Sequence, residues 1–193
     1  MEVLTGLFAA FGLSASAGLN AYIPLLVVAL MARYTNLITL TSPWDTLTNP
    51  WVIGVLVVLL LIEFFADKAP AVNHINDAIQ TFVRPAAGAI VFAASSNVIG
   101  EMHPVFAIIA GILVAGSVHA VKAAAVRPAV TVTTGGLANT PVSIMEDVIS
   151  TVLSILSIVI PVLIATLLII FTAFVIWWLW RRANQMKINA YKP

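Results

Sequence analysis

The organisation of this chain is decided by the stretch EFFADKAPAVNHINDAIQTFVRP, which runs from Glu63 to Pro85. It begins inside an apolar run and carries most of the ionisable side chains of the first half of the chain. An ionisable side chain at the centre of a bilayer costs roughly 2.5–3.5 kcal/mol on insertion scales. Two interpretations therefore compete: a functional polar site, or an interfacial helix whose charges face water.

The composition around this stretch is that of an integral membrane protein. The 193 residues are 61% hydrophobic and 9% charged, whereas soluble domains carry about 25% charged residues. The net charge of +1 argues against a nucleic-acid partner, and the absence of cysteine excludes disulfides and thiolate metal sites. No cofactor motif is evident. The lipid bilayer is the expected partner, and the sequence leaves homo-oligomer formation open.

The hydrophobic pattern predicts an all-α, polytopic transmembrane protein with about five hydrophobic segments, at least four of them full spans. The C-terminal segment ends in Trp177, Trp178 and Trp180, followed by Arg181 and Arg182, which predicts a cytoplasmic C-terminus. We expect a single transmembrane domain over 1–182 and a polar basic tail over 183–193. The five segments are 3–32, 51–66, 85–100, 105–121 and 148–180, the last with a kink at Pro161.

The stretch itself predicts an amphipathic or broken helix near 66–84. Glu63 and Asp67 are four residues apart, so both carboxylates lie on one helix face. Pro70 breaks the helix, and an amphipathic helix follows over 71–83, with Pro85 opening the next span. A hard cation could bind Glu63, Asp67, His74 and Asp77, but these are weak candidates because no fixed metal spacing is present. His74 fits an interfacial histidine better than a metal ligand.

Two other segments combine small and polar residues. Gly12, Ser16 and Asn20 share one face of the first segment, which fits close helix packing or a polar path. The uncharged segment 128–145 contains Gly135 and Gly136, and this favours an irregular structure. That structure is either a re-entrant segment packed in protein or an ordinary surface loop.

A recurrence links the two halves of the chain. Val-Arg-Pro-Ala occurs at 83–86 and again at 126–129, on either side of two spans that a tight turn at 100–104 joins. These spans form an antiparallel hairpin, so Arg84 and Arg127 lie on the same side of the membrane. The hairpin gathers the charged residues of a candidate substrate-binding site, which are Asp67, Lys68, Asp77, Arg84, Lys122, Arg127, Glu146 and Asp147. Asn20, which would line the path, and Asn139 complete this site.

Several of these motifs resemble a known family. They are GLSASAGLNAYIP at 12–24, the Glu-Phe-x-x-Asp-Lys-x-Pro…Asp…Arg-Pro-x-x-Gly-Ala stretch at 63–89, Lys122 with Arg127-Pro, and Gly136-Leu-Ala-Asn with Ser143 and Glu146-Asp147. Together they resemble the bacterial membrane proteins of domain-of-unknown-function family 4126. Asn73 departs from the acid that this family's pattern implies there. The resemblance implies an α-helical protein of the bacterial inner membrane, and it supplies no activity.

Three functions remain in competition. The first is a transporter or channel for a small polar or ionic solute, which needs charged groups and irregular backbone beside a cavity. The second is a membrane enzyme acting on a lipid-linked or phosphorylated substrate, with arginines holding phosphate; no nucleophile–base or metal signature supports it, and no catalytic residue is assigned. The third is a non-catalytic scaffold whose charges pair with one another.

Overall fold

The structure is a computed structural model that describes residues 2–68, 70–96 and 102–190. Within these ranges the chain is helical and contains no strand, which confirms the all-α prediction. The helices are α1 (Glu2–Leu19), α2 (Tyr22–Tyr34), α3 (Pro50–Lys68), α4 (Pro70–Ser96), α5 (Pro104–Val121), α6 (Arg127–Thr134), α7 (Asn139–Val159) and α8 (Pro161–Ala190). A 3₁₀ turn (Trp44–Thr48) precedes α3, and a π-helical turn (Lys122–Val126) joins α5 to α6.

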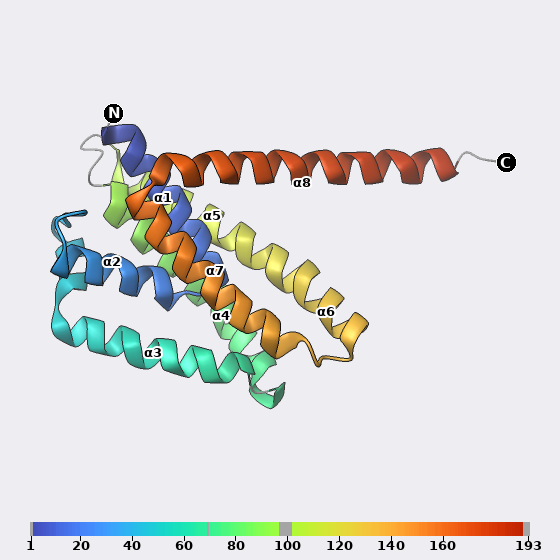
Figure 1. Cartoon of the computed structure of the whole chain (residues 1–193), viewed down its shortest axis with the longest axis horizontal. Helices are drawn as coiled ribbons and strands as arrows, with labels where there is room; N and C mark the ends of the chain where they lie inside the picture. Colours follow the sequence, from blue (N-terminus) through green and yellow to red (C-terminus); the bar gives the residue numbers. More distant parts are fainter. Residues whose placement is uncertain (1, 69, 97–101, 191–193) are drawn as a thin grey trace.

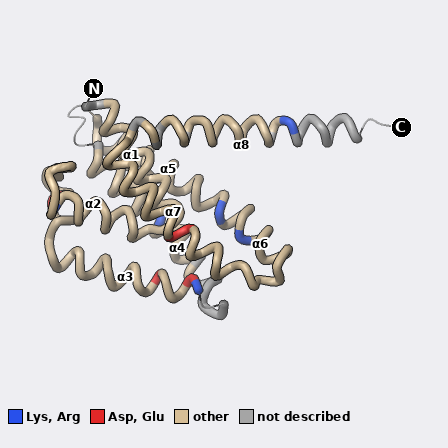
Figure 2. Tube along the Cα trace, viewed as in Figure 1, with Lys and Arg blue, Asp and Glu red and all other residues tan. Residues whose placement is uncertain are grey.

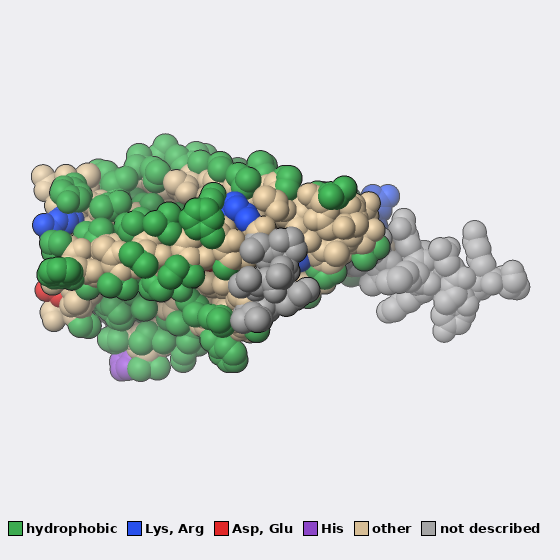
Figure 3. Space-filling model, turned by 90° about the horizontal axis from the view of Figure 1, so that it is seen from below, with side chains coloured by type: hydrophobic (Ala, Val, Ile, Leu, Met, Phe, Trp, Pro, Cys, Tyr) green, Lys and Arg blue, Asp and Glu red, His purple; other side chains and the backbone are tan. Residues whose placement is uncertain are grey.

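Four of the described helices are long and apolar enough to cross a membrane, as expected. They are Pro50–Lys68, Ala78–Ser95, Pro104–Thr134 and Asn139–Val159, and shorter apolar helices occur at Leu4–Leu19, Tyr22–Tyr34 and Ile169–Trp178. Their outer surfaces suit lipid, because large apolar side chains such as Trp51 and Phe65 are exposed. Figure 3 shows hydrophobic side chains over much of the face seen from below, with few charged ones.

The bundle is built on a close pair of helices. Helix α4 packs along α5, and α1 packs against α4, α5 and α7, while α2 and α3 form a second pair beside them (Figure 1). Gly88 on α4 and Gly111 on α5 allow the two backbones to touch, because a Cβ added at Gly111 would lie 2.7 Å from Ala89 Cα. Small residues at such a crossing are how helices approach closely within a bilayer.

The first hydrophobic segment is two helices instead of one. Helix α1 ends at Leu19 and α2 begins at Tyr22. The side chain of Asn20 stabilises the break, since its Oδ1 accepts hydrogen bonds of 3.1 Å from the backbone N–H groups of Tyr22 and Ile23. An asparagine oxygen in this position satisfies amide groups that have no partner within the helix.

Helix α4 differs from the prediction in two ways. It continues through Pro85 instead of starting there, because packing on both sides of the proline outweighs the one hydrogen bond that its missing N–H removes. Its first half also turns its polar face inward: Asn76, Gln80 and Arg84 are buried, while Ile79 and Phe82 are exposed. These polar side chains, with the charge of Arg84, therefore point into the protein and not into water.

The chain from 128 to 145 is more regular than predicted. Helix α6 occupies residues up to Thr134, and α7 begins at Asn139. The irregular part is the short turn between them, where Gly135 and Gly136 have φ angles of +62° and +87°. Glycine is favoured there because other residues rarely adopt positive φ. Leu137 is 87% exposed, so the turn is not enclosed by the protein as a buried re-entrant segment would be.

The last apolar segment breaks at the predicted proline. Helix α7 ends at Val159 and α8 begins at Pro161. Figure 1 shows α8 running past the end of the bundle as a separate long helix, with its first part near α1. The backbone of α8 continues to Ala190, so most of the expected polar tail is a helical extension.

Helices α1 and α7 meet through hydroxyl groups. Ser16 Oγ lies 2.8 Å from Ser150 Oγ and 2.6 Å from Ser154 Oγ, and all three side chains are fully buried. It also donates a 2.8 Å hydrogen bond to the carbonyl oxygen of Ser150. The small-residue face of the first segment thus packs closely, as one of its two interpretations predicts.

This contact predicts a cross-link. In this cysteine-free chain, the double variant Ser16→Cys with Ser154→Cys should form a disulfide under mild oxidation, because the two side chains already touch. Mass spectrometry of the proteolysed protein should recover the joined peptides. The matched control is Ser16→Cys with Thr151→Cys, since Thr151 lies on the exposed side of α7. Equal cross-linking in both variants would contradict the described packing.

Candidate functional site

The charged side chains of the bundle gather where α3 ends and α6 begins, against the middle of α4 and the first half of α7. Figure 2 shows acidic and basic residues of these helices near one another, while most of the remaining trace is uncharged. Three acids and three bases in this region are buried. They form the ionic network, which we define as Glu63, Asp67, Arg84, Lys122, Arg127 and Glu146.

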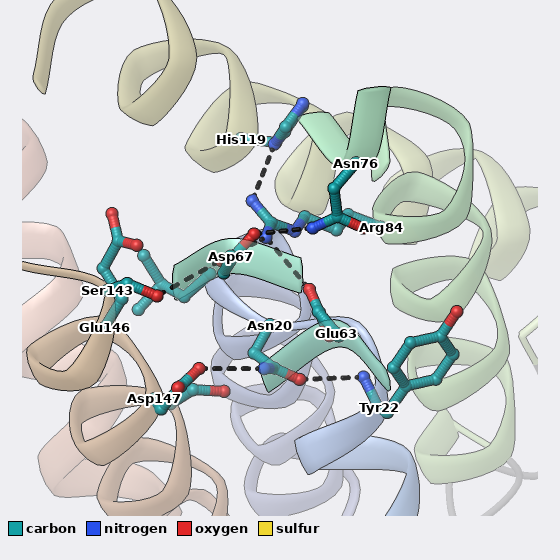
Figure 4. Close-up of polar contacts among 12 residues, drawn as sticks. Asn20, Tyr22, Glu63, Asp67, Asn76, Arg84, His119, Ser143, Glu146 and Asp147 are labelled. Atoms are coloured by element: carbon teal, nitrogen blue, oxygen red, sulfur yellow. Dashed lines mark hydrogen bonds and ion pairs between the residues drawn. The ribbon is translucent and has the colours of Figure 1, made fainter. Parts of the chain in front are cut away.

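Arg84 lies at the centre of the α4 side of the network and is completely buried. Its Nη2 is 3.0 Å from Glu63 Oε1 and 3.8 Å from Asp67 Oδ2. Its Nη1 donates to His119 Nδ1 at 3.1 Å (Figure 4). Because arginine cannot accept a hydrogen bond, His119 must accept through Nδ1, which leaves Nε2 to donate to Thr81 Oγ1 at 3.2 Å. His119 is therefore neutral in this arrangement.

Asp67 connects the two halves of the network. Its Oδ2 lies 3.1 Å from Arg127 Nη2 and 4.0 Å from Lys122 Nζ, in addition to Arg84. Neutral side chains complete its environment: Asn76 donates to Oδ1 at 2.6 Å, and Ser143 donates to Oδ2 at 3.3 Å. Both arginines thus contact one carboxylate. The tight turn at 100–104 of the predicted hairpin lies partly outside the described residues.

Glu146 closes the network on the α7 side. Its Oε2 is 2.8 Å from Lys122 Nζ and 3.2 Å from Arg127 Nη2. Lys122 Nζ also donates to the carbonyl oxygen of Leu19 at 3.1 Å, at the C-terminal end of α1, where a cation is favoured. Every acid of the network therefore has a base within 4 Å, and the six charges sum to zero.

The π-helical turn explains how Lys122 and Arg127 reach the same carboxylates. In a regular α-helix, residues five apart point in different directions. Here the backbone N–H of Arg127 bonds to the carbonyl oxygen of Lys122, which is an i→i+5 bond. Such turns are rare in proteins, and those that occur often lie at functional sites.

A second, more exposed pair lies beside the network. Lys68 Nζ is 3.1 Å from Asp147 Oδ2, and the two side chains are 14% and 16% exposed. Asn20 joins this pair by donating to Asp147 Oδ1 at 2.9 Å (Figure 4). The residue that breaks the first segment thus connects α1 to α7.

A pocket of about 260 Å³ opens next to these charges. Asp67 and Lys68 form one side of it, and the turn between α6 and α7 forms the other, with Gly135, Gly136, Leu137, Asn139 and Thr140. Arg84 and Arg127 do not line it, so the arginines reach the pocket only through Asp67.

Eight of the ten predicted site residues come together, and Asn139 lies beside them without joining the charged groups. The structure places eight in the network or its neighbouring pair: Asn20, Asp67, Lys68, Arg84, Lys122, Arg127, Glu146 and Asp147. Asn139 lines the pocket but bonds to Thr131 Oγ1 at 3.1 Å. The side chain of Asp77 lies outside the described residues, as does that of His74.

Two of the four suggested metal ligands, Glu63 and Asp67, contact arginines in the structure. The described side chains contain no group of three or more His, Asp or Glu suited to a metal ion. Sequence reasoning did not assign Asn76, His119 or Ser143 to the site. Their spacing was a usable signal, because Ser143 lies three residues before Glu146 and His119 three before Lys122, on the same helix faces.

The chain belongs to the family described as a domain of unknown function, DUF4126, whose model matches residues 7–181. No curated protein and no solved structure matches the chain. The family confirms the resemblance carried by the motifs at 12–24 and 63–89. The function therefore has to be argued from the site.

Proposed function

We propose that this membrane protein is a transporter or channel for a small polar or ionic solute, with its binding site at the charged end of the bundle. The observation that supports this most is the pocket of about 260 Å³ that Asp67 and Lys68 line. It places a space for a solute directly against a buried ionic network.

The lining of the pocket suits a solute with charge and hydrogen-bonding groups. Asp67 and Lys68 offer opposite charges, Thr140 offers a hydroxyl, and Asn139 offers an amide. A liquid water molecule occupies about 30 Å³, so the space holds a molecule of several heavy atoms. A solute that displaces Lys68 from Asp147 or Arg127 from Asp67 replaces one ionic contact with another.

Broken helices beside the pocket also support transport. The chain is interrupted between α1 and α2 at Asn20, and between α6 and α7 at Gly135 and Gly136. Transporters commonly bind substrates where helices are discontinuous, because free backbone groups and helix ends are available there. Lys122 already uses one such end through the Leu19 carbonyl oxygen.

We also propose an orientation and a membrane. Arg181 follows the tryptophans of α8, which supports a cytoplasmic C-terminal end under the positive-inside rule. The family resemblance supports the bacterial inner membrane, with the lipid bilayer as the partner of the exposed apolar side chains.

Uptake into proteoliposomes tests the proposal. We expect the reconstituted protein to take up at least one of four radiolabelled probes, namely rubidium, chloride, phosphate or glycine, faster than empty liposomes. Thr140→Trp should reduce this uptake at least tenfold, because an indole at Thr140 fills the pocket from the wall that lies opposite Asp67 and Lys68. Asp67→Asn should also reduce it by removing the charge next to the pocket.

The matched control is Ser117→Ala, which removes an exposed hydroxyl of α5 far in sequence from the pocket. It should leave uptake unchanged. Uptake of no probe by a protein that is folded in the liposome would count against transport, and so would full uptake by Thr140→Trp.

One observation favours a second candidate, a purely structural brace. Each acid of the network pairs with a base, and such pairing locks helix ends together without any solute. A brace predicts that Thr140→Trp has no functional consequence, whereas the transport proposal predicts a loss.

A further inference from the structure

Three buried polar atoms near the network have no hydrogen-bond partner among the described residues. They are Glu63 Oε2, Gln80 Oε1 and Arg84 Nε. The residues that carry them are at most 2% exposed. A buried polar atom without a partner is costly, so groups of this kind normally bind ordered water.

The three atoms belong to side chains that share one neighbourhood. Arg84 Nη2 bonds to Glu63 Oε1 at 3.0 Å, and Gln80 lies one helical turn before Arg84 on the same face of α4. The Tyr22 hydroxyl is a hydrogen-bonding neighbour of the Gln80 side chain. Figure 4 shows Glu63 between Tyr22 and Arg84.

The chemistry of these atoms selects the ligand. The oxygens of Glu63 and Gln80 accept hydrogen bonds, and Arg84 Nε donates one. A water molecule donates twice and accepts at least once, so its hydrogen-bonding capacity matches two acceptors and one donor. A metal cation would be repelled by Arg84, and a chloride ion would be repelled by Glu63.

We propose that Glu63, Gln80 and Arg84 bind one ordered water molecule between α3 and α4, beside Tyr22. This site goes beyond the proposed transport function, and it does not depend on it. The bound water joins the ionic network to the side chain of Gln80, next to Tyr22 of α2.

A high-resolution experimental structure of the full chain tests this directly. We expect a density peak about 2.7–3.2 Å from all three atoms, which is the hydrogen-bonding distance range. The peak should be lost in Gln80→Leu and kept in Tyr22→Phe, because the phenyl variant retains all three binding atoms. A direct hydrogen bond from Gln80 Nε2 to Glu63 Oε2, with no peak, would overturn the proposal.

Radiolytic hydroxyl labelling supplies a second measurement in solution. Bound water is a local source of hydroxyl radicals, so oxidation of Tyr22 should be detected by mass spectrometry and should fall severalfold in Gln80→Leu. Phe92 is an internal control, since it is fully buried in an apolar cluster. Unchanged Tyr22 oxidation in a folded Gln80→Leu variant would also overturn the proposal, and Ser117→Ala should match the wild type.

Discussion

Replacing Arg84 with alanine is expected to lower the free energy of unfolding by about 3–5 kcal/mol, the usual cost of removing one partner of a buried ion pair. The side chain is fully buried, and its Nη2 is the nearest cationic group to Glu63, at 3.0 Å. Without Arg84, the Glu63 carboxylate stays buried but has lost the cation that neutralises it. Denaturation in detergent, followed by tryptophan fluorescence, measures the change.

A double-mutant cycle separates the ion pair from simple loss of packing. Glu63→Ala alone should also destabilise strongly, because it leaves Arg84 without its closest acid. The double variant should lose much less free energy of unfolding than the two single variants lose together, since neither charge then remains unpaired. Additive losses would contradict the description of Arg84 and Glu63 as a buried pair.

Lys68→Ala is the matched control for this cycle. Lys68 also forms one ion pair, at 3.1 Å to Asp147, but both side chains are partly exposed. Water can solvate the remaining carboxylate, so we expect a loss of only about 0–1 kcal/mol. A large loss would mean that the outer pair is as essential to the fold as the buried one.

Replacing Gly111 with leucine should have the other large effect, because it forces α4 and α5 apart. An added Cβ would contact the Gly88 carbonyl oxygen and lie 2.7 Å from Ala89 Cα. These are backbone atoms that cannot rotate away. Overpacking commonly costs about 1–3 kcal/mol, and we expect at least the upper end here. The yield of monodisperse protein and its melting temperature in detergent measure the effect.

Gly54→Leu is the control for this substitution. Gly54 is also helical and lies within a candidate span, but an added Cβ there meets nothing within 4 Å. The variant should fold as the wild type does, and the better helix propensity of leucine should stabilise it slightly. If Gly111→Leu and Gly54→Leu behave alike, the close crossing of α4 and α5 is not what the structure describes.

The sequence is sufficient for the class of the fold and for the grouping in space of most residues of the candidate site. Hydropathy alone separates the spans, because every long helix here carries an apolar surface for lipid. The recurrence at 83–86 and 126–129 lies at the two ends of the predicted hairpin. Because the ends of a hairpin lie close together, it predicts that Arg84 and Arg127 are neighbours. The breaks at Pro70 and Pro161 follow from the chemistry of proline.

Other features depend on contacts that local patterns do not contain. Asn20 ends one helix and starts another through its own side chain, whereas Pro85 fails to end α4 because residues on both sides of it are packed. The π-helical turn that aligns Lys122 with Arg127 has no distinctive amino-acid pattern by which the sequence could reveal it. Glu63 was considered only as a metal ligand, because its partner Arg84 lies 21 residues away in sequence.

The exact cancellation of charge in the ionic network has an electrical consequence. Its three acids and three bases sum to zero, so a uniform transmembrane voltage exerts no net force on the group. Moving one elementary charge through the full voltage is worth about 2.3 kcal/mol per 100 mV. Because the resting network has no net charge, the membrane voltage does not change its energy. One added ion or proton would give the network a net charge, on which the membrane potential then acts.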